Sequence, residues 1–453
     1  MLDSINSSMQ TQLARCSFCG AAHGPSTPLI TGIEGAICEA CVRLADQVVT
    51  NWGRKRALDE MHGPIPKPEK IKDILDAYVI GQDLGKEILA VAVYNHYKRL
   101  KHESGDSGFG HLHNEVELGK SNILLIGPTG TGKTLLASTL ARIVGVPFVV
   151  ADATTLTQAG YVGDDVENIL ARLLDVAEGN VGRAEWGIVY LDEVDKLARS
   201  PELATNTRDI SGEGVQQALL RLVEGAQVKV SLKGKRRDGN AEEVIINTRN
   251  ILFIAGGAFP GLEKHIAKRL QPAASGIGFH AEPVKAESEP VLSEVLDATQ
   301  PEDLRRFGLI PEFIGRFPVL APLEALDEAA LVRILTEPRN ALTRQYQRLF
   351  AYDNVVLEFT DDALGAIARQ AIERDTGARG LRSILEQILR KTMYEIPSQP
   401  EVRRCVVNAE VVRGESPVIR EGGAPYSAGL GQPLDPNAVS DGQAERRASG
   451  GVA

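Results

Sequence analysis

The stretch that decides the fold of this chain is Gly127-Pro128-Thr129-Gly130-Thr131-Gly132-Lys133-Thr134. An apolar run at 123–126 precedes it and a helix-forming run at 135–143 follows it, which is the order strand, loop, helix. In that setting the glycines let backbone N–H groups turn toward a polyphosphate. Lys133 adds a positive charge beside the outer phosphates, and the Thr134 hydroxyl can ligate Mg²⁺. The flanking pattern disfavours an ordinary glycine-rich turn, so the stretch predicts a nucleoside triphosphate site.

A second motif lies downstream, where an apolar strand at 188–191 ends in two acids, Asp192 and Glu193. Phosphoryl transfer depends on positioned charge and an oriented nucleophile. We expect Asp192 to hold Mg²⁺ through water and Glu193 to polarise the water that attacks the γ-phosphate. An acidic strand end alone is often only a solvated terminus. Its combination with the phosphate loop instead indicates a hydrolytic nucleotide site.

The runs around these motifs indicate an α/β fold. Strand-like segments alternate with helical patterns, as a parallel sheet covered on both faces requires, and they lie at 148–150, 187–191 and 251–255. Beyond residue 318 helical patterns dominate, and they lie at 328–350, 361–374 and 380–394. We therefore expect an α/β nucleotide-binding domain followed by a smaller, mainly helical domain.

The bulk composition limits the remaining possibilities. A chain of 453 residues is long enough for about three domains, and 43% apolar with 24% charged residues is typical of soluble globular proteins. The formal charge of −10 gives no general attraction to nucleic acid. No apolar run approaches the roughly 20 residues that cross a bilayer, and the N-terminus lacks an apolar signal core. We expect a cytoplasmic protein.

Four of the five cysteines form two pairs, Cys16-x₂-Cys19 and Cys38-x₂-Cys41. Each pair points two thiolates at one centre, and together they complete the tetrahedral sulfur set that structural Zn²⁺ accepts. Disulfides are disfavoured in a reducing compartment, and a redox-active pair is disfavoured because no βαβ pattern follows. The fifth cysteine, Cys405, has no His or Cys neighbour and is expected to be a buried structural thiol.

Composition shifts suggest the domain boundaries. A helical apolar stripe that includes Leu44, Val48 and Trp52 follows the second cysteine pair, and it fits either packing within its own domain or a dimer or partner contact. A proline-containing stretch then predicts a semi-rigid linker. The expected organisation is a zinc-binding domain at 1–55, a linker at 56–70, a large ATPase domain at 71–317, a small lid domain at 318–412 and a disordered tail at 413–453.

These features together resemble the ClpX family of AAA+ protein unfoldases over roughly residues 12–412. The resemblance is carried by the Cys₄ unit, the loop at 127–134, the run at 191–196 and the run at 211–218. It implies an AAA+ module, a homohexameric ring, and an ATPase that unfolds protein substrates with the help of adaptors. Such a ring translocates its substrates into a ClpP-type peptidase. Peptidase chemistry itself is not expected here, because neither a Gly-x-Ser-x-Gly elbow nor a His-Glu-x-x-His pair occurs.

The resemblance also implies roles for residues outside the two motifs. The segment 78–80 matches the part of the family that lines the adenine pocket, which makes the nucleotide ATP. Arg316 matches an arginine finger that reaches a neighbouring subunit's ATP, so the expected catalytic residues are Glu193 and Arg316. Arg379 matches the sensor-2 arginine. The expected nucleotide-binding set is Tyr78, Val79, Ile80, the eight residues 127–134, Leu135, Asp192 and Arg379.

Two further segments carry expectations about partners. Tyr161 and Val162, between glycines, match the pore loop whose aromatic grips substrate polypeptide. The tripeptide Ile277-Gly278-Phe279 matches the sequence that docks into clefts of the peptidase ring, and exposed apolar residues are costly unless something binds them. One departure is the basic stretch at 233–238, which lacks the histidine that the family carries in a substrate-engaging loop.

Three other interpretations remain to be weighed. An HslU-type unfoldase lacks an N-terminal Cys₄ unit, so residues 16–41 argue against it. An ATPase that remodels nucleic acid or nucleoprotein complexes, with the zinc unit as a DNA reader, is disfavoured by the net charge and by the lack of a basic, aromatic-interleaved patch in residues 1–60. A scaffold that only binds ATP is disfavoured by Glu193 and Arg316.

Overall fold

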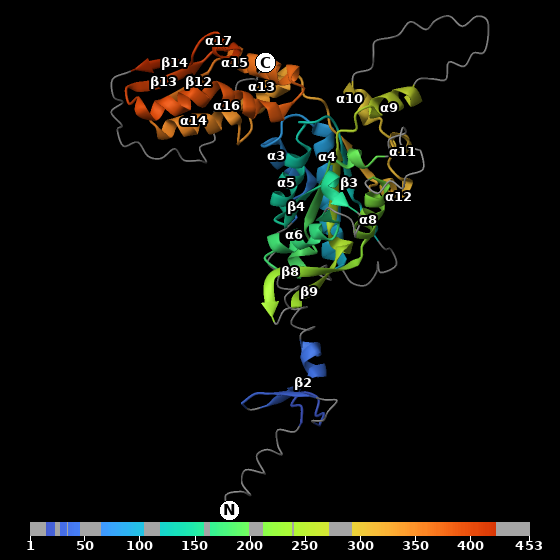
Figure 1. Cartoon of the computed structure of the whole chain (residues 1–453). Helices are drawn as coiled ribbons and strands as arrows, with labels where there is room; N and C mark the ends of the chain where they lie inside the picture. Colours follow the sequence, from blue (N-terminus) through green and yellow to red (C-terminus); the bar gives the residue numbers. More distant parts are fainter. Residues whose placement is uncertain are drawn as a thin grey trace, which may run out of the picture. The chain divides into compact units, whose positions relative to one another are not determined.

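The structure is a computed structural model, and it describes residues 15–22, 28–33, 35–45, 65–103, 118–157, 164–198, 212–237, 240–270 and 292–422. By its internal contacts the chain divides into two compact units, residues 1–342 with 368–383 and residues 343–367 with 384–453. Figure 1 shows the helices and strands of both units. Among the described residues, no helix is both long and apolar enough to span a membrane.

A five-stranded parallel sheet forms the centre of the first unit. Its strands lie in the order β11-β3-β10-β7-β4, and each neighbouring pair is parallel. They are β3 (Ile123–Ile126), β4 (Phe148–Asp152), β7 (Ile188–Asp192), β10 (Leu252–Gly257) and β11 (Val319–Pro322). Carboxyl ends of parallel strands meet at one edge of the sheet, so the loop after β3 and the acids that end β7 come together there. This confirms the predicted α/β fold class.

Alternate strand residues enter two hydrophobic cores. On one face, Ile123 and Tyr190 join a core shared with α3 (Pro68–Asp76), α4 (Asp83–Glu103) and α5 (Lys133–Val144). On the other face, Leu124 and Phe253 join a core shared with α6 (Asn168–Val176) and α8 (Glu213–Glu224). Every residue of β3 and β10 is buried, and each buried Leu, Ile or Phe contributes about 1.5–3 kcal/mol. The sheet is therefore a rigid support for the loops at its carboxyl edge.

Several smaller elements complete the first unit. Strands β8 and β9 form an antiparallel hairpin in which Gln227 pairs with Asn247. The bounds are β5 (Leu156–Thr157), β6 (Asp164–Asp165), α7 (Val181–Ala184), β8 (Gln227–Arg237), β9 (Asn240–Asn247) and α13 (Glu328–Thr336). Short 3₁₀ turns follow β4, β7 and β9, and they span Ala153–Thr155, Val194–Leu197 and Thr248–Asn250.

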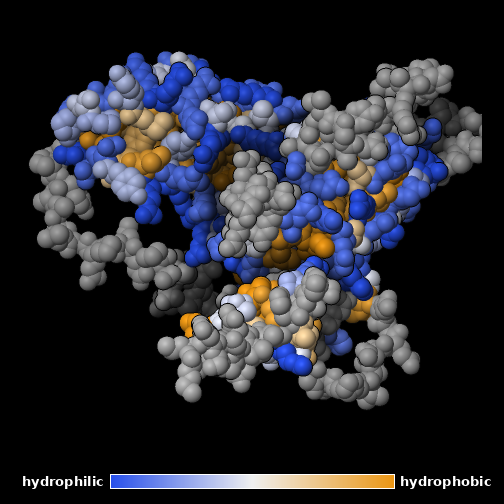
Figure 2. Space-filling view, turned by 60° about the horizontal axis from the view of Figure 1, so that its bottom comes forward, coloured by the Kyte–Doolittle hydropathy of each residue, from blue (hydrophilic) through white to orange (hydrophobic). Residues whose placement is uncertain are grey.

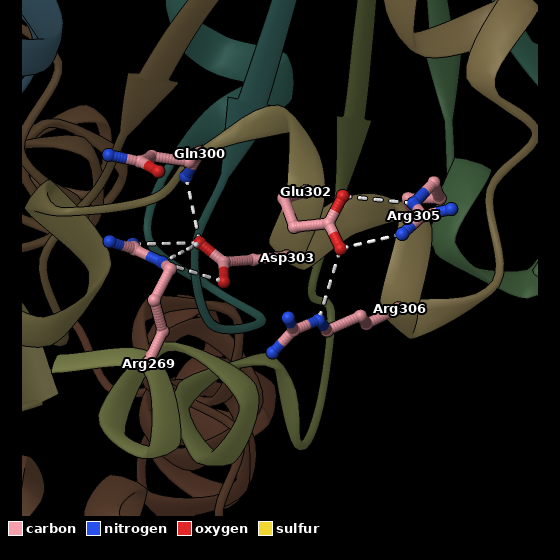
Figure 3. Close-up of polar contacts among 6 residues, drawn as sticks. All are labelled: Arg269, Gln300, Glu302, Asp303, Arg305 and Arg306. Atoms are coloured by element: carbon pink, nitrogen blue, oxygen red, sulfur yellow. Dashed lines mark hydrogen bonds and ion pairs between the residues drawn. The ribbon is translucent and has the colours of Figure 1, made fainter. Parts of the chain in front are cut away.

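Four helices follow β10, and an ion pair with one fully buried partner joins two of them, α9 and α11 (Figure 3). The four helices are α9 (Leu262–Leu270), α10 (Leu292–Asp297), α11 (Pro301–Phe307) and α12 (Pro311–Gly315). Arg269 of α9 donates from Nη2 to Oδ2 of fully buried Asp303 at 2.9 Å, and the backbone N–H of Gln300 donates to the same oxygen at 2.9 Å. Close by, Glu302 pairs with the more exposed Arg305 and Arg306.

The cysteine-containing part, residues 15–45, is small. Strands β1 (Leu29–Thr31) and β2 (Ala36–Cys38) are antiparallel, and a helical stretch covers residues 39–45. Only Cys16, Ala36 and Cys38 are buried among its described residues. Four of its large apolar side chains are exposed, and they are Phe18, Ile30, Ile33 and Leu44. Figure 2 shows that hydrophobic residues interrupt the hydrophilic surface in several places.

The second unit combines helices with a three-stranded sheet. In this sheet β13 lies between β12, to which it is parallel, and β14, to which it is antiparallel. Cys405 of β13 is fully buried, as predicted, and burial raises the pKa of its thiol. The elements are α14 (Leu342–Tyr352), β12 (Val356–Phe359), α15 (Asp361–Glu373), α16 (Ala378–Glu395), β13 (Val402–Val407), α17 (Ala409–Arg413) and β14 (Ile419–Gly422). The end of α15 and the start of α16 belong to the first unit.

Three local features differ from the sequence-based expectation. The helical run at 328–350 is two helices, because Pro338 lies between α13 and α14 and cannot continue a helix. Helix α3 begins at Pro68, inside the predicted linker, because proline is tolerated at the first helical position. Residues 419–422, assigned to the disordered tail, form β14 and pair with β13.

Candidate functional site

A cavity of about 550 Å³ lies within the first unit. It is lined by residues that end or follow β3, β7 and β10, together with the first residues of α16. Its lining residues are Thr129, Gly130, Gly132, Lys133, Thr134, Leu135, Asp192, Glu193, Asp195, Lys196, Gly257, Ala258, Ala378 and Arg379. Nine of the residues predicted from the sequence are therefore neighbours around one cavity, namely Thr129, Gly130, Gly132, Lys133, Thr134, Leu135, Asp192, Glu193 and Arg379.

The glycine-rich loop turns directly into α5. Gly132 has φ 96° and Lys133 is the first residue of the helix. A side chain at Gly132 would be strained by that backbone conformation. The N-terminus of α5 therefore presents free backbone N–H groups and a partial positive charge at the cavity, which is a ready site for phosphate.

Lys133 is buried beneath this loop. Its Nζ donates to the carbonyl of Gly127 at 2.7 Å and to the carbonyl of Pro128 at 2.8 Å. Burial lowers the pKa of Lys133 to about 8, opposed by the charges of Asp192 and Asp195. A buried ammonium is stabilised by any anion placed next to it, so the loop and its lysine fit a polyphosphate.

The two acids at the end of β7 occupy different backbone conformations. Asp192 Oδ2 accepts from Thr134 Oγ1 at 3.1 Å, so the two expected Mg²⁺ ligands already face each other. Its Oδ1 accepts from Tyr190 Oη at 3.2 Å and from the N–H of Glu193 at 3.0 Å. Glu193 itself has φ 57°, an uncommon left-handed conformation for a residue with a side chain, of the kind that clusters at functional sites.

Asp195, Gly257 at the end of β10 and Ala258 directly after it were not predicted as site residues. Asp195 is 5% exposed, and its Oδ1 accepts from the N–H of Ala258 at 3.1 Å. Its Oδ2 lies 3.9 Å from Lys196 Nζ. Asp195 lies only two residues after Glu193, and this short spacing could have indicated that it belongs to the same site. Gly257 and Ala258 could be found only from the strand order, which places β10 between β3 and β7.

Arg379 reaches the cavity from the start of α16. The turn before it touches the phosphate loop, since a Cβ at Gly130 would meet the carbonyl oxygen of Thr376 at 2.9 Å. In the same way, a Cβ at Gly377 would meet the carbonyl oxygen of Thr129 at 2.9 Å. Close backbone contact thus holds a permanently charged guanidinium beside the loop, where it also acts to lower the pKa of Lys133.

The other expected nucleotide residues lie next to the cavity or support its loop. Val79 is buried, and its Cγ1 would lie 3.9 Å from a Cβ at Gly132. Tyr78 stacks under the guanidinium of Arg142 at 4.7 Å. Ile80 is buried, and Thr131 donates from Oγ1 to Pro128 O at 2.9 Å. The segment 78–80 is therefore beside the phosphate loop, although it is not among the lining residues.

Arg316 does not line this cavity. It directly follows α12 as its C-cap residue, it is about half exposed, and its Nη2 lies 2.8 Å from Glu224 Oε1. The expected pore-loop residues Tyr161 and Val162 and the docking tripeptide Ile277-Gly278-Phe279 lie outside the described residues.

The four paired cysteines form a separate centre. Their Sγ atoms all lie within 4.8 Å of one another, and Cys19 Sγ lies 3.6 Å from Cys38 Sγ. A tetrahedral ion with Zn–S bonds of about 2.3 Å needs sulfurs at close to this separation. The backbone supports the arrangement, because the N–H of Cys38 donates to Cys16 Sγ at 3.3 Å.

The four thiols differ in how readily they lose their protons. Hydrogen bonding from the Cys19 backbone lowers the pKa of Cys16 to about 6, whereas the hydrogen bond with the Cys19 side chain raises the pKa of Cys41 to about 12. Four neighbouring thiolates repel one another, so without a cation only some of them lose their protons. These four ligands therefore fit Zn²⁺.

Comparison with known families agrees with both sites. Residues 119–320 match the AAA domain (Cdc48 subfamily), and residues 326–409 match the C-terminal, D2-small domain, of ClpB protein. Residues 14–51 match the ClpX C4-type zinc finger. A protein of Methylococcus capsulatus, described as ATP-dependent Clp protease ATP-binding subunit ClpX 3, is 69% identical over 94% of this chain and 100% of its own length. The chain belongs to the ClpX family.

Two other relatives are described as ATP-dependent Clp protease ATP-binding subunit ClpX. The one from Azotobacter vinelandii is 58% identical over 87% of this chain and 88% of its own length. The one from Treponema denticola is 48% identical over 88% of this chain and 94% of its own length. As a ClpX-family AAA protein, this chain is an ATPase and not itself a peptidase, and it binds ATP, Mg²⁺ and Zn²⁺.

Proposed function

We propose that this chain is an ATP-dependent protein unfoldase that works as a hexameric ring in the cytoplasm and feeds unfolded polypeptide to a ClpP-type peptidase. The observation that carries the proposal is the single cavity lined by Lys133, Asp192, Glu193 and Arg379. Such a set supplies phosphate binding, metal binding and water activation together. The relatives' names supply the link to a Clp protease.

Each residue of the cavity has a distinct role in this proposal. Lys133 and the N–H groups at the start of α5 bind the outer phosphates, and Arg379 adds a second cation beside them. Thr134 and Asp192 would hold Mg²⁺, which neutralises charge on the phosphates. Glu193 accepts a proton from the attacking water as the γ-phosphate leaves, since it follows the strand end that carries Asp192.

Ring formation would make hydrolysis depend on assembly. Arg316 lies outside the chain's own cavity and is about half exposed, so it is available to a neighbouring subunit. A guanidinium presents a fork of donors that matches phosphate oxygens. A contact of this head-to-tail kind forms a ring when the rotation between neighbouring subunits closes. Glu224 would hold the arginine until a neighbour's nucleotide replaces it.

Substrate handling is assigned to two segments outside the described residues. Tyr161 and Val162 would grip polypeptide in the pore, because an aromatic between glycines combines a large amphipathic surface with a permissive backbone. The tripeptide 277–279 would dock into an apolar cleft of the peptidase. The reduced thiols of the Cys₄ site suit the cytoplasm, where disulfides are rare.

The direct test is degradation of a tagged, folded reporter by the full-length chain with a ClpP-type peptidase and ATP. Deletion of residues 277–279 should abolish degradation while ATP hydrolysis continues, whereas deletion of residues 440–442 in the C-terminal tail should change neither. Tyr161→Ala should spare hydrolysis and slow unfolding. ATP hydrolysis that responds to single-stranded DNA but not to unfolded protein would overturn the proposal in favour of nucleic-acid remodelling.

A further inference from the structure

Lys86 is a lysine that is almost completely buried, outside the cavity described above. It lies in the first turn of α4, and only 2% of its side chain is exposed. Its Nζ donates to Asp76 Oδ1 at 2.6 Å and to the backbone carbonyl of Val79 at 2.6 Å. Burying an ammonium is costly unless it is paired and hydrogen-bonded. The cost of burying the Lys86 ammonium therefore suggests that its charge has a role at this position.

The contact to Val79 fixes a short segment between two helices. Helix α3 ends at Asp76 and α4 begins at Asp83, and the intervening chain contains Gly81 and Gln82, each with φ 64°. Gln82 anchors the far end of this segment, because its amide donates to the carbonyl of Glu324 at 2.8 Å and accepts from the N–H of Glu324 at 2.7 Å. Lys86 anchors the near end. The segment is thus held at both ends by buried side chains.

The anchored segment lies beside the phosphate loop. Val79 approaches Gly132, and Tyr78 stacks on Arg142 of α5, the helix that the loop begins. Within the described part of the chain, neither the N–H nor the carbonyl of Ile80 has a hydrogen-bond partner. One free donor and one free acceptor are complementary to an adenine edge, where the exocyclic amine donates, whereas guanine presents an accepting oxygen at that place.

We propose that Lys86 is a positioning residue that sets the preference for adenine over other nucleobases. By holding the Val79 carbonyl, Lys86 fixes the direction of the next peptide groups and so the donor and acceptor that meet the base. The phosphates are bound by different residues, so the contribution of Lys86 is confined to the base. The inference rests on the proposed role of residues 78–80 in the adenine pocket and extends it.

The alternative is that Lys86 and Asp76 only fasten α3 to α4. Loss of a fastening of that kind would weaken binding of every nucleotide equally. A change in the ratio between ATP and GTP is expected only if Lys86 acts through the base-binding segment. Base preference therefore separates the two roles.

The test is Lys86→Met in the full-length chain, with kcat and KM measured for ATP and for GTP. Methionine keeps much of the apolar stem and removes the ammonium. We expect the KM for ATP to rise about tenfold, the size of one charge-assisted hydrogen bond. The kcat should stay within about twofold, and the preference for ATP over GTP should fall about tenfold. An unchanged preference, or an equal loss for both nucleotides, would overturn the inference.

Lys72→Met is the matched control. Lys72 also pairs with Asp76, at 3.5 Å, and with Asp83, at 2.9 Å, but its charge is more exposed and it makes no bond to Val79. Its removal should leave the base preference unchanged. If Lys86→Met does not fold, as judged by circular dichroism, Asp76→Asn decides instead. That variant removes the charge partner and should lower the preference, and an unchanged preference would overturn the inference.

A third variant separates this inference from the proposal beneath it. Val79→Ala shortens the side chain that faces Gly132 and leaves the carbonyl that Lys86 holds. If Val79→Ala changes the base preference and Lys86→Met does not, only the role of Lys86 is wrong. If neither variant changes it, the assignment of residues 78–80 to the adenine pocket fails as well.

Discussion

The nucleotide cavity and the cysteine centre are built in opposite ways. The cavity lies at the ends of strands that are buried on both faces, so its side chains are positioned by a large core. The described residues of the cysteine-containing part bury only Cys16, Ala36 and Cys38, and two of these three are themselves ligands. In the first region, the hydrophobic core holds the site residues in place. In the second region, the bound metal stabilises the fold, as expected for a unit too small to bury an adequate core.

Zinc removal should have the largest effect and should be confined to one region. Structural zinc contributes on the order of 10 kcal/mol to the folding of small metal domains, so a chelator or Cys38→Ser should unfold residues 15–45. Without the cation, no bond holds the remaining cysteines together. NMR spectra of the full chain and the zinc content of the purified protein measure the change.

The nucleotide cavity should hardly respond to the same treatment, because none of its lining residues lies in the cysteine-containing part. Effects at distant sites without shared partners are usually independent. The basal rate of ATP hydrolysis should therefore stay within about twofold of the untreated protein. If the rate of ATP hydrolysis fell in proportion to the zinc content, the two regions would not be independent of each other.

Breaking the Arg269–Asp303 pair should have the next largest effect, on stability alone. Arg269→Met leaves fully buried Asp303 without its cation, which should destabilise the first unit by about 3 kcal/mol. Arg305→Met is the matched control from the same cluster (Figure 3), and since its ion pair with Glu302 is exposed, it should cost no more than about 0.5 kcal/mol. The free energies of unfolding of the two variants are compared by urea denaturation monitored by fluorescence, or by calorimetry. Equal losses of stability in the two variants would contradict the account.

Removing the charge of Lys133 should have a smaller effect, on binding. Lys133→Met deletes the ammonium beneath the phosphate loop, and the dissociation constant for ATP should rise about 10- to 100-fold, as expected for one or two hydrogen bonds to a charged group. Isothermal titration calorimetry measures it. Lys196→Met removes a lysine that also lines the cavity but is 56% exposed, so it should weaken binding only a fewfold. Equal losses would mean that burial of the lysine is unimportant.

Much of the first unit was predictable because its signals are local. The strand, loop and helix around residues 127–134, the acids 192–193 and the alternating strand runs all appear as short patterns, and the structure brings them to one edge of a parallel sheet. Arg379 was found only through the family resemblance, because an isolated arginine carries no local signal. The roles of these residues stay predictions, as do those of Arg316, the pore loop and the docking tripeptide.

The features that could not be predicted from the sequence depend on contacts between distant segments or on unusual burial. Strands β12 and β13 pair across α15 and α16, so the sheet of the second unit left only weak local patterns. Lys86 was overlooked because lysine is almost never fully buried, and a pattern cannot show that Asp76 and Val79 are its partners. Gly257 and Ala258 line the cavity because β10 lies between β3 and β7, and local sequence patterns do not show this strand order.

The most direct test of the central claim is Glu193→Gln. The substitution keeps the shape and removes the carboxylate that accepts a proton from water, so ATP should bind with nearly unchanged affinity while hydrolysis falls at least about 100-fold. Binding by calorimetry and phosphate release under saturating ATP and Mg²⁺ give the two numbers. Hydrolysis that persists near the rate of the unmodified protein would contradict the assignment of this cavity as the site of catalysis.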